Sequence, residues 1–342
     1  MVPADDEARF LSIVLTGRND EYGVDFQDRF LRTLSFNHRE LVARGVSFEV
    51  VFVEWAPMPG RPLLIDIALD RVPQLRTGPP FRGLIVDPQY HETLSLNPRL
   101  EYLEFIAKNV GIRRARGEYV LTTNCDVFLG RHVLDVFERR ALEPGVVYRA
   151  ARHDLKMAVD SSNLDWDMLE EPRNLERPPR ALRPPLMAGG TGDFLLLDRE
   201  SFQALRGFNE VYRVARIGID QNFLVKALSI GLAIRDIGGP VYHVNHAGSY
   251  RLTRETYRGR EAGSPIWAEL AFTRRHLRKP AHVGAGPRAR ASGGSAQGCS
   301  AVLVERPAAA RRSARGGIAG RAHGRPLPWQ LRQTLITLKR DG

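Results

Sequence analysis

Short apolar runs alternate with helix-like segments through the first part of the chain, and this alternation limits what the chain can fold into. The runs over 11–16, 48–53 and 83–86 predict buried strands. Between the first two, apolar residues at helical spacing predict a helix over 26–42, with Gly45 placed as its terminator. A strand–helix–strand order predicts parallel pairing with right-handed crossovers. We therefore expect an α/β fold with a mostly parallel, Rossmann-like central sheet flanked by helices.

The next predicted strand carries polar residues at its carboxyl end. A helix is expected over 99–114, and a strand over 118–123 follows Gly117. This strand leads directly into Asn124, Cys125 and Asp126. Because ligands of open parallel sheets bind at the carboxyl ends of the strands, these residues mark a candidate site.

Residues 152–188 interrupt the regular pattern. They are rich in proline and acidic residues, which predicts a long loop or small insertion of the kind that serves as a lid or binding surface. Beyond it, the pattern predicts strands over 194–197 and 232–237 and helices over 199–205 and 219–230.

The net charge of +11 is concentrated at the C-terminal end. Residues 281–342 hold eleven Lys or Arg against two acidic residues, so the rest of the chain carries only +2. The composition shifts to Arg, Ala, Gly and Pro after residue 274, and we expect 275–342 to be a disordered, basic, low-complexity tail. A flexible N-terminus is expected over 1–9. The charge therefore predicts no specific nucleic-acid partner.

Cysteine content and the termini predict a cytoplasmic protein. Cys125 and Cys299 form no C-x-x-C pair, which favours a reduced setting without a zinc site. Acidic residues at 5–7 stand where a secretory signal would be basic. The apolar stretch 223–241 is interrupted by charges, so we expect no transmembrane segment, and any membrane contact would be peripheral, at the inner face.

Three motifs together point to a family. They are SIVLTGRN over 12–19, KNVGIRRARGEYVLTTNCD over 108–126, and GFNE over 207–210 followed by GIDQ over 218–221. Their order and spacing resemble the inverting glycosyltransferases of the GT-A fold, especially the large family 2, across roughly 11–248.

The resemblance implies both a domain organisation and a reaction. A GT-A domain would span 10–274, with a nucleotide-binding part over 10–130 and an acceptor part over 131–274. It would move a hexosyl or hexosaminyl group from a nucleotide-diphosphate-sugar to a hydroxyl of a glycan, lipid-linked or other acceptor, as in polysaccharide biosynthesis.

The middle motif implies a metal site. Mn²⁺ or Mg²⁺ held by carboxylates would neutralise the departing nucleotide diphosphate. Positions i and i+2 at a strand end point the same way, so we expect Asp126 on the metal and Asn124 beside it, towards ribose or a water. The family usually has Asp where Asn124 stands, so one negative charge is missing. An isolated Asp126 could instead cap the following helix.

The resemblance also implies a histidine ligand from the end of the last strand. His243 and His246 are the candidates, and imidazole is a good ligand for Mn²⁺. Residues at i and i+3 of a strand face opposite ways, so we expect only one of them to point into the site, with His243 favoured.

Asp220 is the candidate general base. The family's matching Asp takes the proton of the acceptor hydroxyl, although Ile219 here replaces the Glu of the family's acidic pair. A capping role at the start of a helix is the alternative. Asp193, in a glycine-rich turn, is the reserve candidate for acceptor binding.

Polar residues after the first two strands are the candidates for holding the nucleotide. The resemblance places Thr16, Arg18, Asn19 and Glu54 near the base and ribose. Two more candidates lie one helical turn apart, and the second could pair with the diphosphate: Asn109 and Arg113. Surface arginines are solvated by default.

Two other functions compete with glycosyl transfer. A nucleotidyltransferase would need a G-x-G-x-R loop after the first strand, which residues 16–19 do not provide. A non-catalytic nucleotide-sugar or carbohydrate-binding relative is suggested by Asn124 and Ile219, which replace two family carboxylates.

Overall fold

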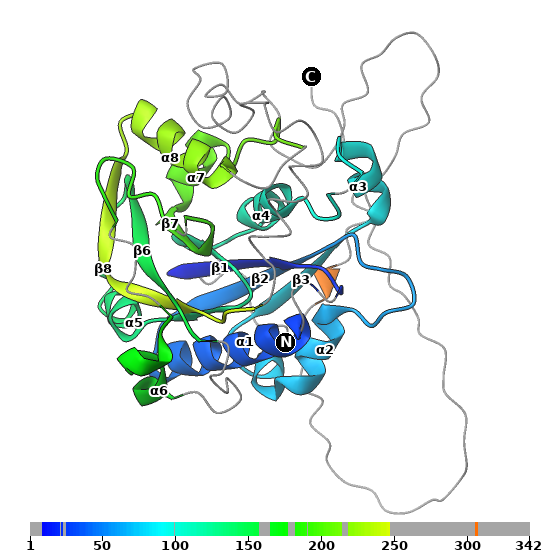
Figure 1. Cartoon of the computed structure of the whole chain (residues 1–342), viewed down its shortest axis with the longest axis horizontal. Coiled ribbons are helices and arrows are strands. Elements are labelled where there is room, and N and C mark those ends of the chain that lie inside the picture. The colour runs from blue at the N-terminus through cyan, green and yellow to red at the C-terminus, as the bar shows by residue number, and fades with distance from the viewer. Residues whose placement is uncertain are drawn as a thin grey trace, which may run out of the picture.

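A nine-stranded mixed sheet forms the centre of the protein (Figure 1). The computed structural model describes residues 9–20, 22, 25–98, 100–156, 165–176, 182–189, 191–213, 218–246 and 305–306. In sequence order the strands are β1 (Leu11–Gly17), β2 (Phe48–Trp55), β3 (Phe81–Val86), β4 (Tyr119–Thr123), β5 (Val127–Leu129), β6 (Val146–Asp154), β7 (Phe194–Asp198), β8 (Ala233–His243) and β9 (Glu305–Arg306). Their order across the sheet is β5-β8-β6-β7-β4-β1-β2-β3-β9.

The strand directions bring the carboxyl ends of most strands to the same edge of the sheet. β3, β2, β1 and β4 are parallel neighbours, β7 runs antiparallel between β4 and β6, and β8 is parallel to β6. The carboxyl ends of β1, β2, β4, β6 and β8 therefore lie at the same edge as the amino end of β7. The predicted α/β architecture is confirmed, and its parallel pairing is continuous from β3 to β4.

Helices cover both faces of the sheet. They are α1 (Phe26–Ala43), α2 (Leu64–Arg71), α3 (Pro88–Leu94), α4 (Glu104–Ile112), α5 (Arg131–Glu138), α6 (Trp166–Glu170), α7 (Arg199–Leu205) and α8 (Ile219–Ser229). α1 and α2 lie on one face, and α4, α7 and α8 on the other (Figure 1).

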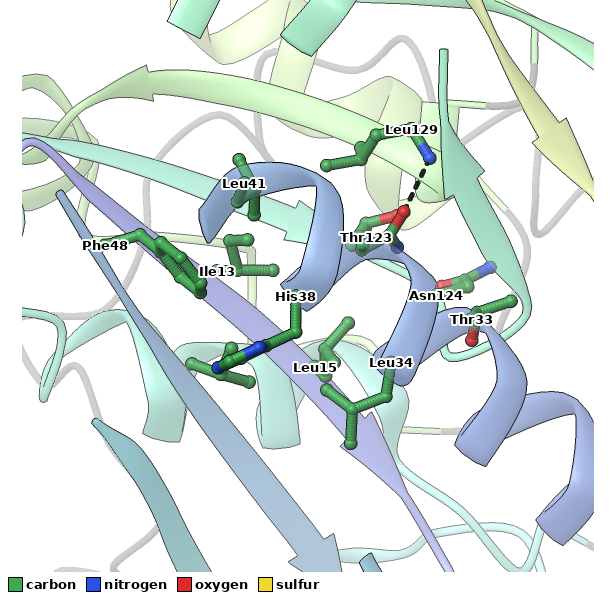
Figure 2. Close-up of a pocket in the computed structure, with 12 residues that line it drawn as sticks. Ile13, Leu15, Thr33, Leu34, His38, Leu41, Phe48, Thr123, Asn124 and Leu129 are labelled. Atoms are coloured by element: carbon green, nitrogen blue, oxygen red, sulfur yellow. Dashed lines mark hydrogen bonds between the residues drawn. The ribbon is translucent and has the colours of Figure 1, made fainter. Parts of the chain in front are cut away.

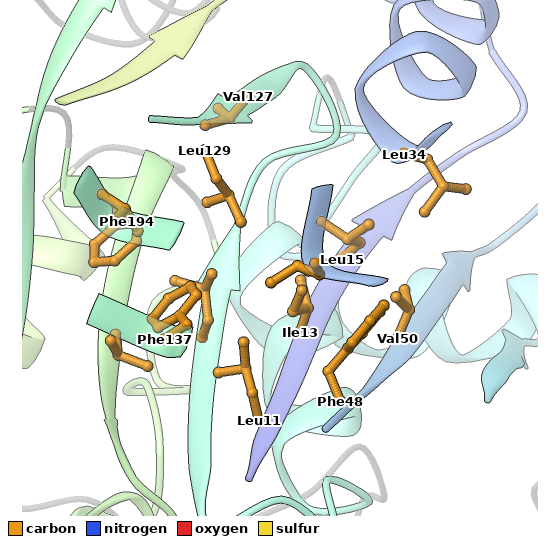
Figure 3. Close-up of a cluster of buried hydrophobic side chains, with 14 of the residues drawn as sticks. Leu11, Ile13, Leu15, Leu34, Phe48, Val50, Val127, Leu129, Phe137 and Phe194 are labelled. Carbon is orange, nitrogen blue, oxygen red and sulfur yellow. The ribbon is translucent and has the colours of Figure 1, made fainter. Parts of the chain in front are cut away.

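Apolar side chains from alternate strand positions fill the space under α1. Leu11, Ile13 and Leu15 of β1 meet Phe48 and Val50 of β2 in this core (Figure 3). Val14 and Val51 point to the opposite core, beneath α4 and α8. Burying apolar surface on both faces explains why these strands are continuously hydrophobic in sequence.

Most predicted elements are confirmed, with differences at the boundaries. The helix expected over 99–114 begins at Glu104, and a separate helix, α3, precedes it. β8 continues past its predicted end at 237 to His243. β6 was not predicted, and its last three residues fall in the segment 152–188 that we expected to be a loop. The outer half of β6, residues 149–154, contains two arginines, two alanines, a histidine and an aspartate without a regular period of two, which hides its strand character in sequence.

The terminal segments are mostly outside the described residues. The expected tail over 275–342 lies there except for 305–306, which pair with β3 as β9. The expected flexible segment 1–9 lies there except for residue 9. Among the residues that the structure describes, none of the helices combines the length and the apolar character that crossing a bilayer requires.

A small cavity beneath α1 contains a buried histidine. His38 projects from α1 among Ile13, Leu34 and Phe48 (Figure 2). His38 is 3% exposed, its ring packs edge-on against Phe48, and neither ring nitrogen has a hydrogen-bond partner within the described part of the chain. Burial lowers the pKa of His38 below 6.5, because a charged imidazole without a partner is poorly solvated there.

We predict that His38 makes the fold sensitive to mild acid. The unfolded chain protonates this residue near pH 6.5, whereas the folded chain resists protonation to lower pH. The stability linked to neutral His38 is therefore present above pH 6.5 and is lost as pH falls towards the folded-state pKa. In denaturant unfolding at pH 7.5 and pH 5, His38→Phe should lose less stability on acidification than wild type, by about 1 kcal/mol.

The matched control is His132→Gln, because His132 is exposed on α5. This variant should keep the wild-type difference between the two pH values. An identical loss of stability in wild type and His38→Phe would contradict the prediction.

Candidate functional site

Strand registers gather polar side chains at the shared edge of the sheet. Asp154, the last residue of β6, pairs with His243, the last residue of β8. His243 also pairs with Val127, the first residue of β5, which follows Asp126 in the sequence. At the end of β4, Thr123 pairs with Phe194, directly after Asp193. Residues that are far apart in sequence therefore meet here.

Asp126, His243 and His246 form a buried cluster. Asp126 Oδ2 lies 3.6 Å from His243 Nε2 and 3.4 Å from His246 Nε2. One potential ligand atom from each residue lies within 4.8 Å of the others. A carboxylate with two imidazoles is a donor set that suits Mn²⁺ and similar transition metals. The three residues therefore fit a divalent metal ion.

Both histidines reach Asp126, and the expectation that only one would do so was wrong. The strand rule for i and i+3 does not apply, because β8 ends at His243 and His246 lies beyond it. The backbone N–H of Val244 donates to Asp126 O at 2.9 Å, which ties this segment to the Asp126 loop. His246 is 8% exposed, and its Nδ1 has no hydrogen-bond partner within the described ranges.

The charges of Asp126 and His243 stabilise each other. Burial alone would raise the pKa of Asp126, but His243, His246 and Arg29 together hold it well below its usual range. For His243, burial opposes the charged form, yet Asp126 and Asp154 raise its pKa to about 9. A divalent ion bound by His243 near neutral pH would therefore displace a proton from it.

A second layer of contacts orients His243. Its Nδ1 lies 3.0 Å from Asp154 Oδ1 and 2.9 Å from Arg152 Nη2. Arg152 Nη1 also donates to Asp193 Oδ2 at 2.8 Å. A carboxylate on the second ring nitrogen fixes the tautomer and direction of a ligating histidine.

Asn124 does not share contacts with Asp126. β4 ends at Thr123 and the chain turns, so the i and i+2 alignment of a strand is lost. Asn124 Nδ2 donates to Asp193 Oδ1 at 2.7 Å, and Asn124 Oδ1 accepts from Lys108 Nζ at 2.9 Å. Both carboxylate oxygens of Asp193 thus accept hydrogen bonds, from Asn124 and from Arg152.

Asp220 stands in the first turn of α8, beside the turn that contains Gly192 and Asp193. A Cβ added to Gly192 would lie 4.0 Å from Asp220 Oδ2. Burial raises the pKa of Asp220, while Arg149 and Lys108 oppose that rise. Gly218, with φ of 84°, precedes α8, and the Asp220 side chain is not its cap.

The candidates after the first two strands serve mainly to hold loops together. The Asn19 side chain bonds the backbone of Met58, Arg61 and Pro62. Both carboxylate oxygens of Glu54 accept backbone N–H groups at the start of α2, from Leu64 and Ile65. These contacts leave Asn19 and Glu54 engaged within the protein.

Thr16 lies near the carboxyl end of β1, and Arg18 directly follows that strand. The Tyr102 hydroxyl hydrogen-bonds Thr16 Oγ1. Arg18 Nε donates to Ala56 O at 3.1 Å, and its Nη1 lies 3.5 Å from both Asp20 and Glu101.

The candidates Asn109, on α4, and Arg113, directly after it, interact with the segment that follows α7. Asn109 bonds the backbone N–H and C=O of Phe208 and the Glu210 carboxylate. Arg113, the residue after α4, is exposed; partial desolvation lowers its pKa, and the charge of Glu210 opposes that lowering. α4 thus uses Asn109 to hold the loop after α7.

Four residues of the site were not predicted: Arg29, Lys108, Arg152 and Asp154. Lys108 is the first residue of the middle motif, and the structure shows that it is fully buried. Arg152 and Asp154 lie on the unpredicted strand β6. Arg29, Thr33 and Asn37 recur every four residues on α1, but this helix carries polar residues at many other positions as well, so spacing alone does not single out Arg29.

Comparisons with known proteins give distant structural matches only. No protein-family model and no curated protein matches the chain. Similar solved structures include a fragment of TarS from S. aureus, residues 1–349 of that protein (15% identity, 69% of this chain, TM-score 0.40). They also include the same fragment in complex with UDP-GlcNAc (17%, 76%, 0.44) and TarS (15%, 73%, 0.39). This chain spans 60%, 64% and 38% of those three chains, respectively.

We predict that Asp154 supports the charged form of His243. Replacing Asp154 with Asn keeps the side-chain size but removes the negative charge beside Nδ1. The pKa of His243, about 9 in the wild type, should fall in Asp154→Asn. A histidine NMR titration would measure this. Asp236→Asn, at an exposed position of β8, the strand that also carries His243, should leave the pKa of His243 unchanged. An unaltered titration in Asp154→Asn would contradict this role.

Proposed function

We propose that this chain transfers a sugar from a nucleotide-diphosphate-sugar to an acceptor hydroxyl, with a divalent metal ion and inversion at the anomeric carbon. The observation that carries the proposal is the buried Asp126–His243–His246 cluster at the carboxyl edge of the sheet, which Arg152 connects to Asp193. The motifs of the sequence supply the reaction type, and the cluster supplies a place for the ion.

The proposed roles divide between two groups of residues. Asp126, His243 and His246 would hold Mn²⁺ or Mg²⁺, which when bound supplies positive charge to the departing diphosphate. Asp154 would keep His243 aligned through the contact of 3.0 Å to its Nδ1, and Arg152 would hold Asp154 in place by donating to its Oδ1 at 2.8 Å. We place the nucleotide over the part of the edge formed within 10–130 and the acceptor over the part formed within 131–274.

Asp220 is the proposed base. One of its carboxylate oxygens accepts the proton of the acceptor hydroxyl while the hydroxyl oxygen forms a bond to the anomeric carbon. The bond from the anomeric carbon to the phosphate oxygen breaks, and its electron pair leaves with the diphosphate. A pKa raised by burial makes Asp220 a better proton acceptor than an exposed carboxylate. Asp193 contributes less directly, because Asn124 and Arg152 already bond both of its carboxylate oxygens.

A binding protein without turnover is the second candidate. Asn124 is neutral where the family has a carboxylate, and its side chain bonds Lys108 and Asp193 rather than Asp126. The activity test separates the two functions, because the second candidate would bind donor and ion without consuming the donor.

We predict that Asp220→Asn lowers kcat by about 10²- to 10⁴-fold in hydrolysis and transfer assays against a panel of UDP- and GDP-sugars with Mn²⁺. Asp126→Ala should abolish turnover, and added Mn²⁺ should not restore it. Circular dichroism should show that both variants remain folded.

Asp70→Asn is the matched control for loss of a carboxylate, because Asp70 is exposed on α2. It should retain wild-type turnover. Full activity of Asp220→Asn would refute its role as base, and donor binding without turnover by the wild type would favour the binding protein.

A further inference from the structure

A polar stripe on α1 holds the loop that carries Asp126. Arg29, Thr33 and Asn37 lie one helical turn apart on the same face of the helix. Asn37 Nδ2 donates to Val127 O at 2.8 Å, and its Oδ1 accepts from the N–H of Leu129 at 2.9 Å. The Thr33 hydroxyl donates to the carbonyl of Cys125. The loop backbone is therefore fixed independently of Arg29.

Arg29 differs from the other two because it contacts the charged end of Asp126. Arg29 Nη1 lies 2.6 Å from Asp126 Oδ2, and Nη2 donates to Tyr22 O at 2.6 Å. The Arg29 side chain is 4% exposed. The oxygen it contacts is the one that both histidines approach through Nε2. A guanidinium thus stands at the oxygen best placed to bind an ion.

We propose that Arg29 is a resident cation of the Asp126–His243–His246 site, which competes with the divalent ion for Asp126 Oδ2 and thereby weakens ion binding. This inference rests on the metal role proposed above. An ion on Oδ2 must share that oxygen with the guanidinium or displace it. Two cations in a buried site also repel strongly, since little water screens them.

Because of this competition, the affinity of the site for the ion depends on whether the nucleotide diphosphate is bound. A diphosphate brings negative charge that can pair with the guanidinium and with the ion at the same time. The ion is therefore held weakly by the protein alone and more strongly together with a nucleotide diphosphate. Thr33 and Asn37 keep the loop in place while the Asp126 carboxylate changes partners.

A purely structural role for Arg29 predicts the opposite sign. If the guanidinium only anchored Asp126, its removal would loosen the loop and weaken ion binding. Competition predicts tighter binding when the positive charge is removed. The direction of the change therefore separates the two roles.

The test is a titration of the full chain with Mn²⁺ alone, followed by the EPR signal of free Mn²⁺. Arg29→Met removes the charge and keeps an unbranched side chain, and Arg29→Gln removes it with a polar group. Both should bind Mn²⁺ more tightly than wild type, by about tenfold or more, the scale of effects from groups that contact metal ligands. Arg29→Lys, which keeps a positive charge, should stay near wild type.

Thr33→Val is the matched control on α1, because it removes the contact to Cys125 without changing charge. It should bind Mn²⁺ no more tightly than wild type. Thermal unfolding provides a second readout. Mn²⁺ should raise the Tm of Arg29→Met and Arg29→Gln more than that of the wild type, because ion binding stabilises the folded state.

The inference is overturned if neither uncharged variant binds Mn²⁺ more tightly than wild type, or if Thr33→Val gains affinity equally. Turnover of nucleotide-sugars is measured separately. Tighter binding in the Arg29 variants without any turnover in the wild type would refute the proposed transfer and leave the inference standing. Turnover with unchanged Mn²⁺ affinities would refute the inference alone.

Discussion

The buried carboxylate of Asp126 is the group on which the arrangement of this edge of the sheet depends. Removing such a group from water is costly unless opposite charges and hydrogen-bond donors surround it. Arg29, His243 and His246 all approach one of its oxygens. These partners come from α1, from the end of β8 and from the residues just beyond it, so the charge is satisfied only once distant parts of the chain have packed together.

The network extends from that carboxylate towards the proposed base. His243 contacts Asp154 and Arg152, and Arg152 in turn contacts Asp193. Positive and negative groups alternate along the route from Asp126 through His243, Asp154 and Arg152 to Asp193. Connected polar networks resist rearrangement when their members are satisfied. The contacts that orient the proposed metal ligand His243 therefore continue to Asp193, in the turn beside Asp220.

Local sequence patterns predicted the strands and helices well, and the site only in part. Apolar runs and helical spacing identify β1, α1, β2 and β4, because burial determines those residues directly. β6 was missed because the outer half of this strand lies at the polar edge, and Arg152 and Asp154 were missed with it. The meeting of His243 with His246 depends on where β8 ends, which spacing cannot show. Arg29 pairs with a residue 97 positions away, a relation that only the packed structure reveals.

The central claim, a divalent ion held by Asp126 and two imidazoles, can be tested by electron spin echo envelope modulation of Mn²⁺ bound to the full chain. Imidazole nitrogens bound to Mn²⁺ give characteristic ¹⁴N couplings. The account predicts couplings from two nitrogens, with one lost in His243→Gln and the other lost in His246→Gln. Bound Mn²⁺ without ¹⁴N coupling, or couplings unaffected by either substitution, would contradict it.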